Sequence, residues 1–185
     1  TALHQVADLA QGFKTGADKV FVVEFFKAKD RVSIVKSQET GHTHEVETSA
    51  LRTLVKSEHM KAFEVRSSQL RLIFPYVRDS AKWRLLTPAE MQSRFPKLWK
   101  GYLVPLKSAL AKREKGRWDG ETFYKYSRAQ NFEPLSQPKI MNPDICERPQ
   151  MCWDATGECV FSGGAAGGVA IVPNRGVNPF LLLGI

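Results

Sequence analysis

The stretch that decides the class of fold runs from Val20 to Lys36 and reads VFVVEFFKAKDRVSIVK. Its first part, Val20–Phe26, is a dense run of β-branched and aromatic residues, which is typical of a buried strand. Arg31–Lys36 alternates between apolar and polar residues, so we predict that it is the hairpin partner, with residues 27–30 as the turn. Antiparallel β structure is therefore expected near the start of the chain.

Further strands are predicted along the rest of the chain. Residues 37–48 are polar and are predicted to form a loop or an edge strand. Gln69–Tyr76 alternates until Pro75, which has no N–H to donate to a sheet. After Gly120, short apolar segments separated by proline and glycine predict small, twisted, mostly antiparallel strands. These segments are residues 123–126, 139–141, 151–153, 159–161 and 169–172.

The middle of the chain carries the helix signals. Thr87, Pro88 and Glu90 supply an N-cap, a first helical residue and a returning capping bond, and Pro96 is expected to break the helix. A second helical stretch is predicted over residues 98–114, although a proline inside it argues against an unbroken helix. Its apolar face consists of Leu103, Leu106 and Leu110. The internal proline is Pro105, and Gly116 is expected to end the helix.

Together these signals predict an α+β fold with curved, mostly antiparallel sheets and a basic helical arm inserted in the middle. The predicted organisation is a β-rich lobe over residues 1–78, the helical basic arm over residues 79–117, and a β-rich segment over residues 118–185.

Positive charge is concentrated in the predicted arm. The 185-residue chain has a net charge of +8, and the stretch from Lys82 to Arg117 holds ten basic and two acidic residues, which equals the whole excess. Clustered positive charge attracts phosphate and releases condensed counterions. A polyanion partner is therefore predicted, and the alternative is a solvated helix face.

The location of the protein is predicted from what the sequence lacks. No apolar run reaches the ~20 residues that a membrane helix needs. The run Phe180–Ile185 is apolar but short, and we expect it to begin a core element. Residues 1–8 show no signal-peptide pattern, and the chain has three cysteines, so a reducing bacterial cytoplasm and no membrane partner are predicted.

Most catalytic and metal-binding chemistry is disfavoured by spacing. Cys146, Cys152 and Cys159 are too far apart for a usual structural zinc site, and no Walker or nucleophile-elbow motif is present. The glycine clusters at residues 12–16 and 163–168 are predicted to serve tight turns or close backbone approach. No catalytic residue, metal or cofactor is predicted in this chain.

The segment from Phe123 to Asn131, FYKYSRAQN, remains as a candidate for binding. Arginine can pair with guanine through two hydrogen bonds, glutamine or asparagine can pair with adenine, and aromatic rings can stack. The alternative is that Tyr124 and Tyr126 face a core and that Arg128 makes a structural ion pair.

At this segment the sequence resembles the TaqI-like C-terminal specificity domains of adenine-specific DNA methyltransferases and fused restriction–modification enzymes. The family pattern is roughly Trp-Tyr-x-Tyr-Gly-Arg-x-Gln-Asn, then Pro-Lys-Ile/Leu, Pro-x-Ile, Asp-x-x-Gly and a glycine-rich close. The matching residues are Tyr124, Tyr126, Arg128, Gln130, Asn131, Pro138-Lys139-Ile140, Pro143-Asp144-Ile145, Arg148-Pro149, Asp154-Ala155-Thr156-Gly157 and Ser162-Gly163-Gly164. Upstream, residues 11–21 resemble the family's first motif. Residues 73–76 resemble the strand before its helical arm, and residues 95–113 resemble that arm. Departures from the pattern are Phe123, Ser127 and Asp18.

The resemblance implies a domain that recognises double-stranded DNA and follows a methyltransferase domain in the same polypeptide. That missing domain would flip an adenine and methylate it with S-adenosylmethionine, so no cofactor is expected in this chain. The parent would be an adenine-specific methyltransferase, with or without a fused endonuclease.

Most of the candidate DNA-binding residues fall into three groups. Basic residues of 82–117 are expected at phosphates, Arg128, Gln130 and Asn131 nearer to base edges, and Lys14 and Thr15 at further contacts. The full set is Lys14, Thr15, Lys82, Arg113, Arg117, Tyr124, Tyr126, Arg128, Gln130, Asn131 and Lys139. DNA recognition is the leading hypothesis. The second hypothesis is a protein-docking or structural domain of the same type of enzyme without direct base reading. A self-contained nuclease or zinc enzyme is the third hypothesis.

Overall fold

The hairpin predicted from the opening stretch is present. In the computed structural model, which describes residues 2–80, 82–164 and 166–184, β2 (Val22–Lys29) pairs antiparallel with β3 (Val32–Ser37). The predicted boundaries differ at two places. The short helix α1 (Asp18–Phe21) takes the start of the predicted strand, and β2 continues to Lys29, so the turn is tighter than predicted.

The chain forms two compact units, each assembled from separated segments. Unit 1 consists of residues 1–14, 53–68 and 128–185, and unit 2 consists of residues 15–52 and 69–127. Unit 1 holds eight basic and eight acidic residues, whereas unit 2 holds nineteen basic and eleven acidic residues. The whole net charge of +8 therefore belongs to unit 2.

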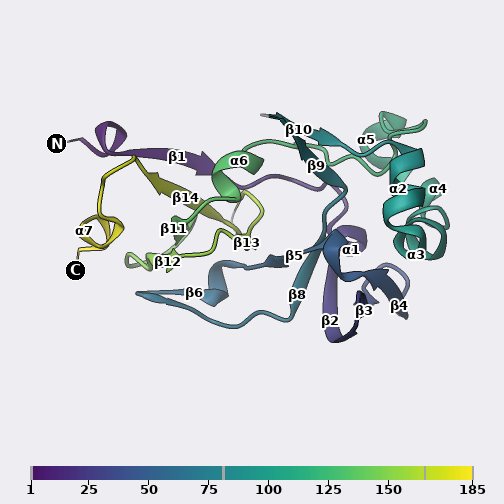
Figure 1. The fold of residues 1–185 in the computed structure, drawn as a ribbon, viewed down its shortest axis with the longest axis horizontal. Helices are drawn as coiled ribbons and strands as arrows, with labels where there is room; N and C mark the ends of the chain where they lie inside the picture. Colours follow the sequence, from purple (N-terminus) through teal and green to yellow (C-terminus); the bar gives the residue numbers. More distant parts are fainter. Residues whose placement is uncertain (1, 81, 165, 185) are drawn as a thin grey trace. The chain divides into compact units, whose positions relative to one another are not determined.

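The sheet of unit 2 has the strand order β5-β8-β2-β3-β4 and is built around the hairpin (Figure 1). Residues 37–48, predicted as loop or edge strand, contain β4 at the edge of this order. The remaining strands of unit 2 form a separate antiparallel hairpin. The bounds are β4 (Thr43–Glu47), β5 (Leu51–Leu54), β8 (Leu70–Ile73), β9 (Tyr76–Asp79) and β10 (Lys82–Leu85), with the short helical turn η2 (Thr48–Ala50) before β5.

The helical residues of unit 2 are divided among short pieces. The capping box of α2 forms as predicted, with Thr87 accepting from the N–H of Glu90 and Glu90 accepting from the N–H of Thr87. Residues 98–114 are not one helix, because a π-helical turn and Pro105 interrupt them. The pieces are α2 (Pro88–Arg94), α3 (Pro96–Leu98), η4 (Trp99–Leu103), α4 (Lys107–Ala111) and α5 (Arg113–Gly116).

Unit 1 contains a four-stranded antiparallel sheet in the order β1-β14-β11-β12. Its strands confirm three of the segments predicted after Gly120, and β13 confirms a fourth by pairing in parallel with Thr53–Leu54. Residues 123–126, by contrast, form turns rather than a strand. The bounds are β1 (Ala7–Gln11), β11 (Lys139–Pro143), β12 (Cys152–Asp154), β13 (Cys159–Val160) and β14 (Gly168–Pro173).

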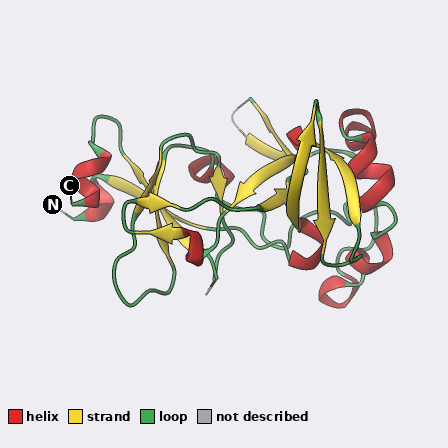
Figure 2. Ribbon diagram, turned by 90° about the horizontal axis from the view of Figure 1, so that it is seen from below, coloured by secondary structure: helices red, strands yellow, loops and turns green. Residues whose placement is uncertain are grey.

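Small elements complete unit 1. Figure 2 shows that the helices of the chain are short and that strands are numerous. The elements are η1 (Leu3–Gln5), η3 (Ser57–His59), β6 (Met60–Lys61), β7 (Glu64–Val65), α6 (Phe132–Leu135) and α7 (Pro179–Leu183). The fold is thus α+β with mostly antiparallel, curved sheets, as predicted.

The apolar run at residues 180–185 forms most of α7. Leu182 and Leu183 pack against the cluster of Ala7, Ile140 and Ile171, so this part supports the expected core element. Leu181 is 72% exposed and Phe180 is 46% exposed, so the run is only partly buried. Ile185 lies outside the described residues. Within the described part of the chain, none of the helices has the length and apolar character needed to span a bilayer.

Candidate nucleic-acid interface

Lys14 and Arg128 are brought side by side by a two-way backbone hydrogen bond. The N–H of Lys14 donates to the carbonyl of Arg128 at 3.1 Å, and the N–H of Arg128 donates to the carbonyl of Lys14 at 2.9 Å. Residues directly opposite in an antiparallel pair project their side chains to the same face. Both side chains are exposed, and neither has a hydrogen-bond or ion-pair partner among the described residues. Two cations therefore share one face of unit 1.

Gln130 and Asn131 follow Arg128 after one intervening residue, Ala129, and are also exposed. Asn131 adopts a left-handed backbone conformation, with φ of 58°, and its Nδ2 donates to the carbonyl of Gln11 at 3.0 Å. That bond fixes the amide of Asn131 to β1 and leaves its Oδ1 unengaged within the described chain. Gln130 makes no side-chain hydrogen bond there either. The structure thus gathers four of the predicted residues, Lys14, Arg128, Gln130 and Asn131, into one group.

Gly12 allows the backbone before Lys14 to pack closely against the backbone of Ser162 and Gly163. A Cβ atom added to Gly12 would lie 2.3 Å from the carbonyl carbon of Ser162, and the N–H of Gly163 donates to the carbonyl of Phe13 at 2.9 Å. Any side chain at position 12 would therefore separate these backbones. The prediction that the glycine clusters serve close approach is confirmed here, although Ala165 in the second cluster lies outside the described residues.

Three of the predicted residues are buried and cannot contact a ligand in this conformation. Thr15 is 1% exposed, and its hydroxyl donates to Asp18 and accepts from the N–H of Ala17 at the start of α1. Tyr124 and Tyr126 are fully buried, and their hydroxyls donate to the carbonyls of Leu86 and Ile73. The two tyrosines therefore follow the core alternative stated above.

Lys139 is also a core residue. Its Nζ lies 2.6 Å from Oδ2 of Asp154, and the two side chains are 0% and 4% exposed. The Asp154 carboxylate also accepts from the backbone N–H groups of Thr156, Gly157 and Cys159. Burial alone would raise the pKa of Asp154, but the hydrogen bond and charge of Lys139, together with the hydrogen bonds from Thr156 and Cys159, outweigh it, and the pKa lies below its ordinary value. This pair stabilises the turn between β12 and β13.

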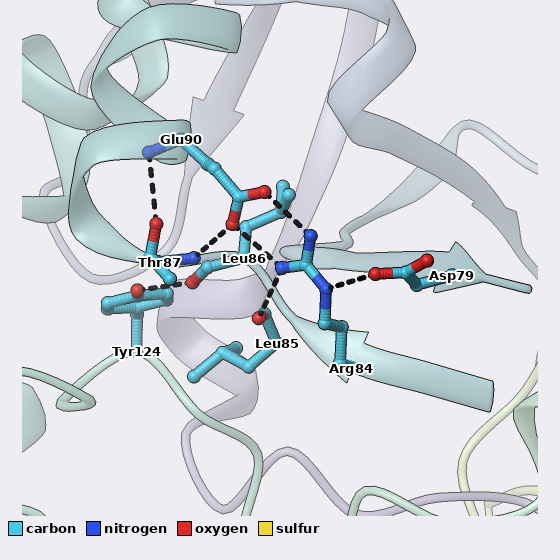
Figure 3. Close-up of polar contacts among 7 residues, drawn as sticks. All are labelled: Asp79, Arg84, Leu85, Leu86, Thr87, Glu90 and Tyr124. Carbon is cyan, nitrogen blue, oxygen red and sulfur yellow. Dashed lines mark hydrogen bonds and ion pairs between the residues drawn. The ribbon is translucent and has the colours of Figure 1, made fainter.

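Two basic residues of the predicted arm, Arg84 and Lys97, are neutralised within unit 2. Arg84 forms a bidentate pair with Glu90 at 2.7 Å and a further pair with Asp79 at 3.1 Å, as Figure 3 shows. The hydrogen bonds from Arg84 and from the N–H of Thr87 lower the pKa of Glu90 to about 2. Lys97 lies 2.6 Å from Glu45.

The other basic residues of 82–117 are mostly free. Arg117 is exposed and lies 3.9 Å from Glu114, whereas Arg113 is half-buried and donates to backbone carbonyls. Six more are exposed and have no carboxylate partner in the described part of the chain: Lys82, Arg94, Lys100, Lys107, Lys112 and Lys115. The charge available to an external anion is therefore smaller than the composition suggests, but it remains clustered in one unit.

Two features of the group were missed by the sequence reasoning. The carbonyl of Gln11 holds Asn131, and the carbonyl of Thr15 accepts from the N–H of Ser127 at 3.1 Å. Backbone acceptors leave no residue-type signal, and both pairs join distant parts of the sequence. Only a predicted pairing of residues 11–15 with residues 127–131 could have shown them.

The group consists of two cations and two amides rather than carboxylates or usual metal ligands. Among the described residues, no three His, Cys, Asp or Glu side chains lie close enough together to hold a metal ion.

Comparison with known proteins adds no relationship, because no protein-family model and no curated protein matches the chain.

Proposed function

We propose that the chain is a DNA target-recognition domain, the specificity domain of a bacterial restriction–modification, adenine-specific DNA methyltransferase. On this proposal it binds duplex DNA and selects its sequence, while a methyltransferase domain of the same polypeptide carries S-adenosylmethionine and the chemistry. The TaqI-like order of motifs from Gln11 to Val172 supports the assignment.

The pair of Lys14 and Arg128 is the observation that carries the proposal. Like charges placed opposite each other on adjacent backbones disfavour folding. The backbone nevertheless presents both cations to solvent on one face, with the amides of Gln130 and Asn131 next in sequence. A phosphate bound by the pair would offset the repulsion, and the arginine and amides are the groups that pair with purine edges.

Phosphate contacts along the duplex are assigned to the basic segment of unit 2. The six exposed cations between Lys82 and Lys115, together with Arg117, provide sequence-independent attraction. We leave Thr15, Tyr124, Tyr126 and Lys139 out of the proposed interface, because each is buried.

Binding of duplex DNA across a salt series tests this function. If the six cations, Arg117, Lys14 and Arg128 all contact phosphates, the slope of log affinity against log salt would reach about −8. Affinity in the micromolar range or weaker, falling steeply with salt, is expected for an isolated module. Absence of binding to any duplex at low salt would contradict the proposal and favour the alternative of a docking domain without base reading.

A further inference from the structure

Arg113 occupies an unusual position within the basic segment. Its Nε donates to the carbonyl of Leu110 at 2.8 Å, and Nη1 donates to the carbonyl of Thr15 at 2.8 Å. Its Nη2 donates to the carbonyls of Phe123 at 2.7 Å and Lys125 at 3.0 Å. One side chain therefore holds three separate stretches of the unit 2 backbone.

The chemistry of these contacts requires a guanidinium group. Arginine has five N–H donors in a fixed planar fork, and four are used here. The group also lies 5.6 Å from the ring centroids of both Phe21 and Trp118. Among the described residues no carboxylate comes within ion-pair distance of Arg113. Four of its donors therefore bind backbone carbonyl oxygens and are not available to a phosphate.

The carbonyls that Arg113 holds belong to the backbone that leads into the candidate group. The carbonyl of Thr15 accepts from both Arg113 and the N–H of Ser127. Thr15 is joined covalently to Lys14, and Ser127 to Arg128. Gly16 completes the arrangement, because a Cβ there would lie 1.8 Å from Oγ of Ser127 and 3.5 Å from Nη1 of Arg113.

We propose that Arg113 is a positioning residue for DNA selection: by fixing the carbonyls of Thr15, Phe123 and Lys125, it orders the two backbone segments that end at Thr15 and Ser127, to which Lys14 and Arg128 are covalently joined. It does so without touching DNA. This inference rests on the proposed function. Its consequence is that Arg113 contributes to discrimination between sequences, whereas its exposed neighbour Lys112 contributes only to overall electrostatic attraction.

Two variants separate these contributions. Arg113→Lys keeps the positive charge but cannot reproduce a four-bond planar fork. Lys112→Gln removes a charge but leaves the fork intact, because the Lys112 side chain makes no hydrogen bond in the described chain. The wild-type protein first selects a preferred duplex from a randomised pool. The affinities of all three proteins for that duplex and for a scrambled duplex are then measured.

Arg113→Lys is expected to lower the ratio of the two affinities by roughly tenfold, with binding to the scrambled duplex unchanged within about twofold. Lys112→Gln is expected to weaken both affinities together and leave the ratio unchanged. If Arg113→Lys keeps the wild-type ratio, the positioning role is wrong while the proposed function stands. If the wild-type protein selects no sequence, the proposed function itself fails.

Amide hydrogen exchange without DNA tests the positioning on its own. In Arg113→Lys, the amides of Ser127 and Arg128 should exchange roughly tenfold faster while those of the β2–β3 hairpin stay within about twofold. Equal acceleration of both sets would mean a general loss of stability and would overturn the inference. Trp118→Leu, which removes one flanking ring, provides a second variant if Arg113→Lys does not fold, and it should accelerate the same two amides selectively.

Discussion

Lys139 and Asp154 form a pair in which neither charge can reach solvent. Removing one member of a buried pair leaves the other without compensation, at a cost of about 3–5 kcal/mol. The two members are not equivalent here. The carboxylate has backbone donors from Thr156, Gly157 and Cys159, whereas the ammonium depends on Asp154 and one long contact to the carbonyl of Gln137 at 3.4 Å.

Asp154→Asn is therefore predicted to destabilise the protein more than Lys139→Met does. The first change leaves a buried ammonium without its partner, and we expect a loss of about 3–5 kcal/mol in the free energy of unfolding. Urea unfolding followed by tryptophan fluorescence measures both. Folded Lys139→Met should bind DNA like the wild type. A loss below about 1 kcal/mol for Asp154→Asn would show that the pair is not buried as described.

Lys14 is predicted to act through its charge alone. Lys14→Ala should weaken binding to all duplexes to a similar extent and reduce the salt slope by about one, because one phosphate contact is lost. Arg175→Ala, which removes an exposed charge from another part of unit 1, is the matched control and should leave the slope unchanged. Identical slopes for Lys14→Ala and the wild type would remove Lys14 from the interface.

At single residues, the sequence indicated residue type and local spacing but not burial. Lys139 and Asp154 lie on adjacent strands, so the pairing that buries them depends on the register of β11 with β12. Tyr126 is buried because its ring packs on Phe21 and Tyr76, which come from other elements. Arg128 is exposed, and its place beside Lys14 depends on a long-range backbone pairing.

The start of α2 joins a local sequence signal to a tertiary contact. Glu90 completes the capping box, and its carboxylate also accepts hydrogen bonds from Nη1 and Nη2 of Arg84 in β10 (Figure 3). The pKa of Glu90 in the folded protein is about 2, below its ordinary value of 4.5. The ionised Glu90 carboxylate therefore stabilises the folded protein fully above pH 4.5, and this contribution is lost as pH falls towards 2.

We predict that the stability difference between wild type and Glu90→Gln depends on pH in this window. The wild type should be more stable at neutral pH, and the difference should shrink progressively as pH falls from about 4.5 to about 2. Chemical unfolding at a series of pH values measures it. Glu121→Gln, at an exposed position with no ion pair in the described chain, is the control. A difference that does not change with pH would contradict the Arg84–Glu90 linkage.

The close approach of residues 16 and 127 gives a prediction with a matched pair. Gly16 and Gly41 share a φ of 71°, but an added Cβ meets Ser127 at Gly16 and nothing within 4 Å at Gly41. Both alanine substitutions carry the left-handed cost of about 1–2 kcal/mol. Gly16→Ala should cost clearly more, since the backbones must separate. Equal losses in thermal unfolding would contradict the close approach.

At the scale of elements, local signals were sufficient where the stabilising contacts are local. The α2 capping box and the β2–β3 hairpin follow from neighbouring residues. The helical stretch over 98–114 did not form as one helix, because Pro105 lacks an N–H and the backbone at Glu114 and Lys115 is left-handed. The left-handed turn could not be predicted from residue types, since neither residue is a glycine.

At the scale of the whole molecule, the charge clusters in one unit while the candidate reading group lies in the other. Unit 2 carries the net charge of +8, and unit 1, which contains Lys14, Arg128, Gln130 and Asn131, is neutral. The sequence predicted the charged segment because it is continuous. The composition of each unit could not be predicted, because both units are assembled from separated segments.

Selection from a randomised duplex pool, followed by sequencing, tests the central claim most directly. The wild-type protein should enrich one short motif, and Arg128→Ala, still folded, should lose preference at one or more positions of that motif while retaining salt-dependent binding. A wild-type pool no different from the input, or an Arg128→Ala pool that enriches the same motif equally, would contradict the claim that this chain reads DNA through Arg128.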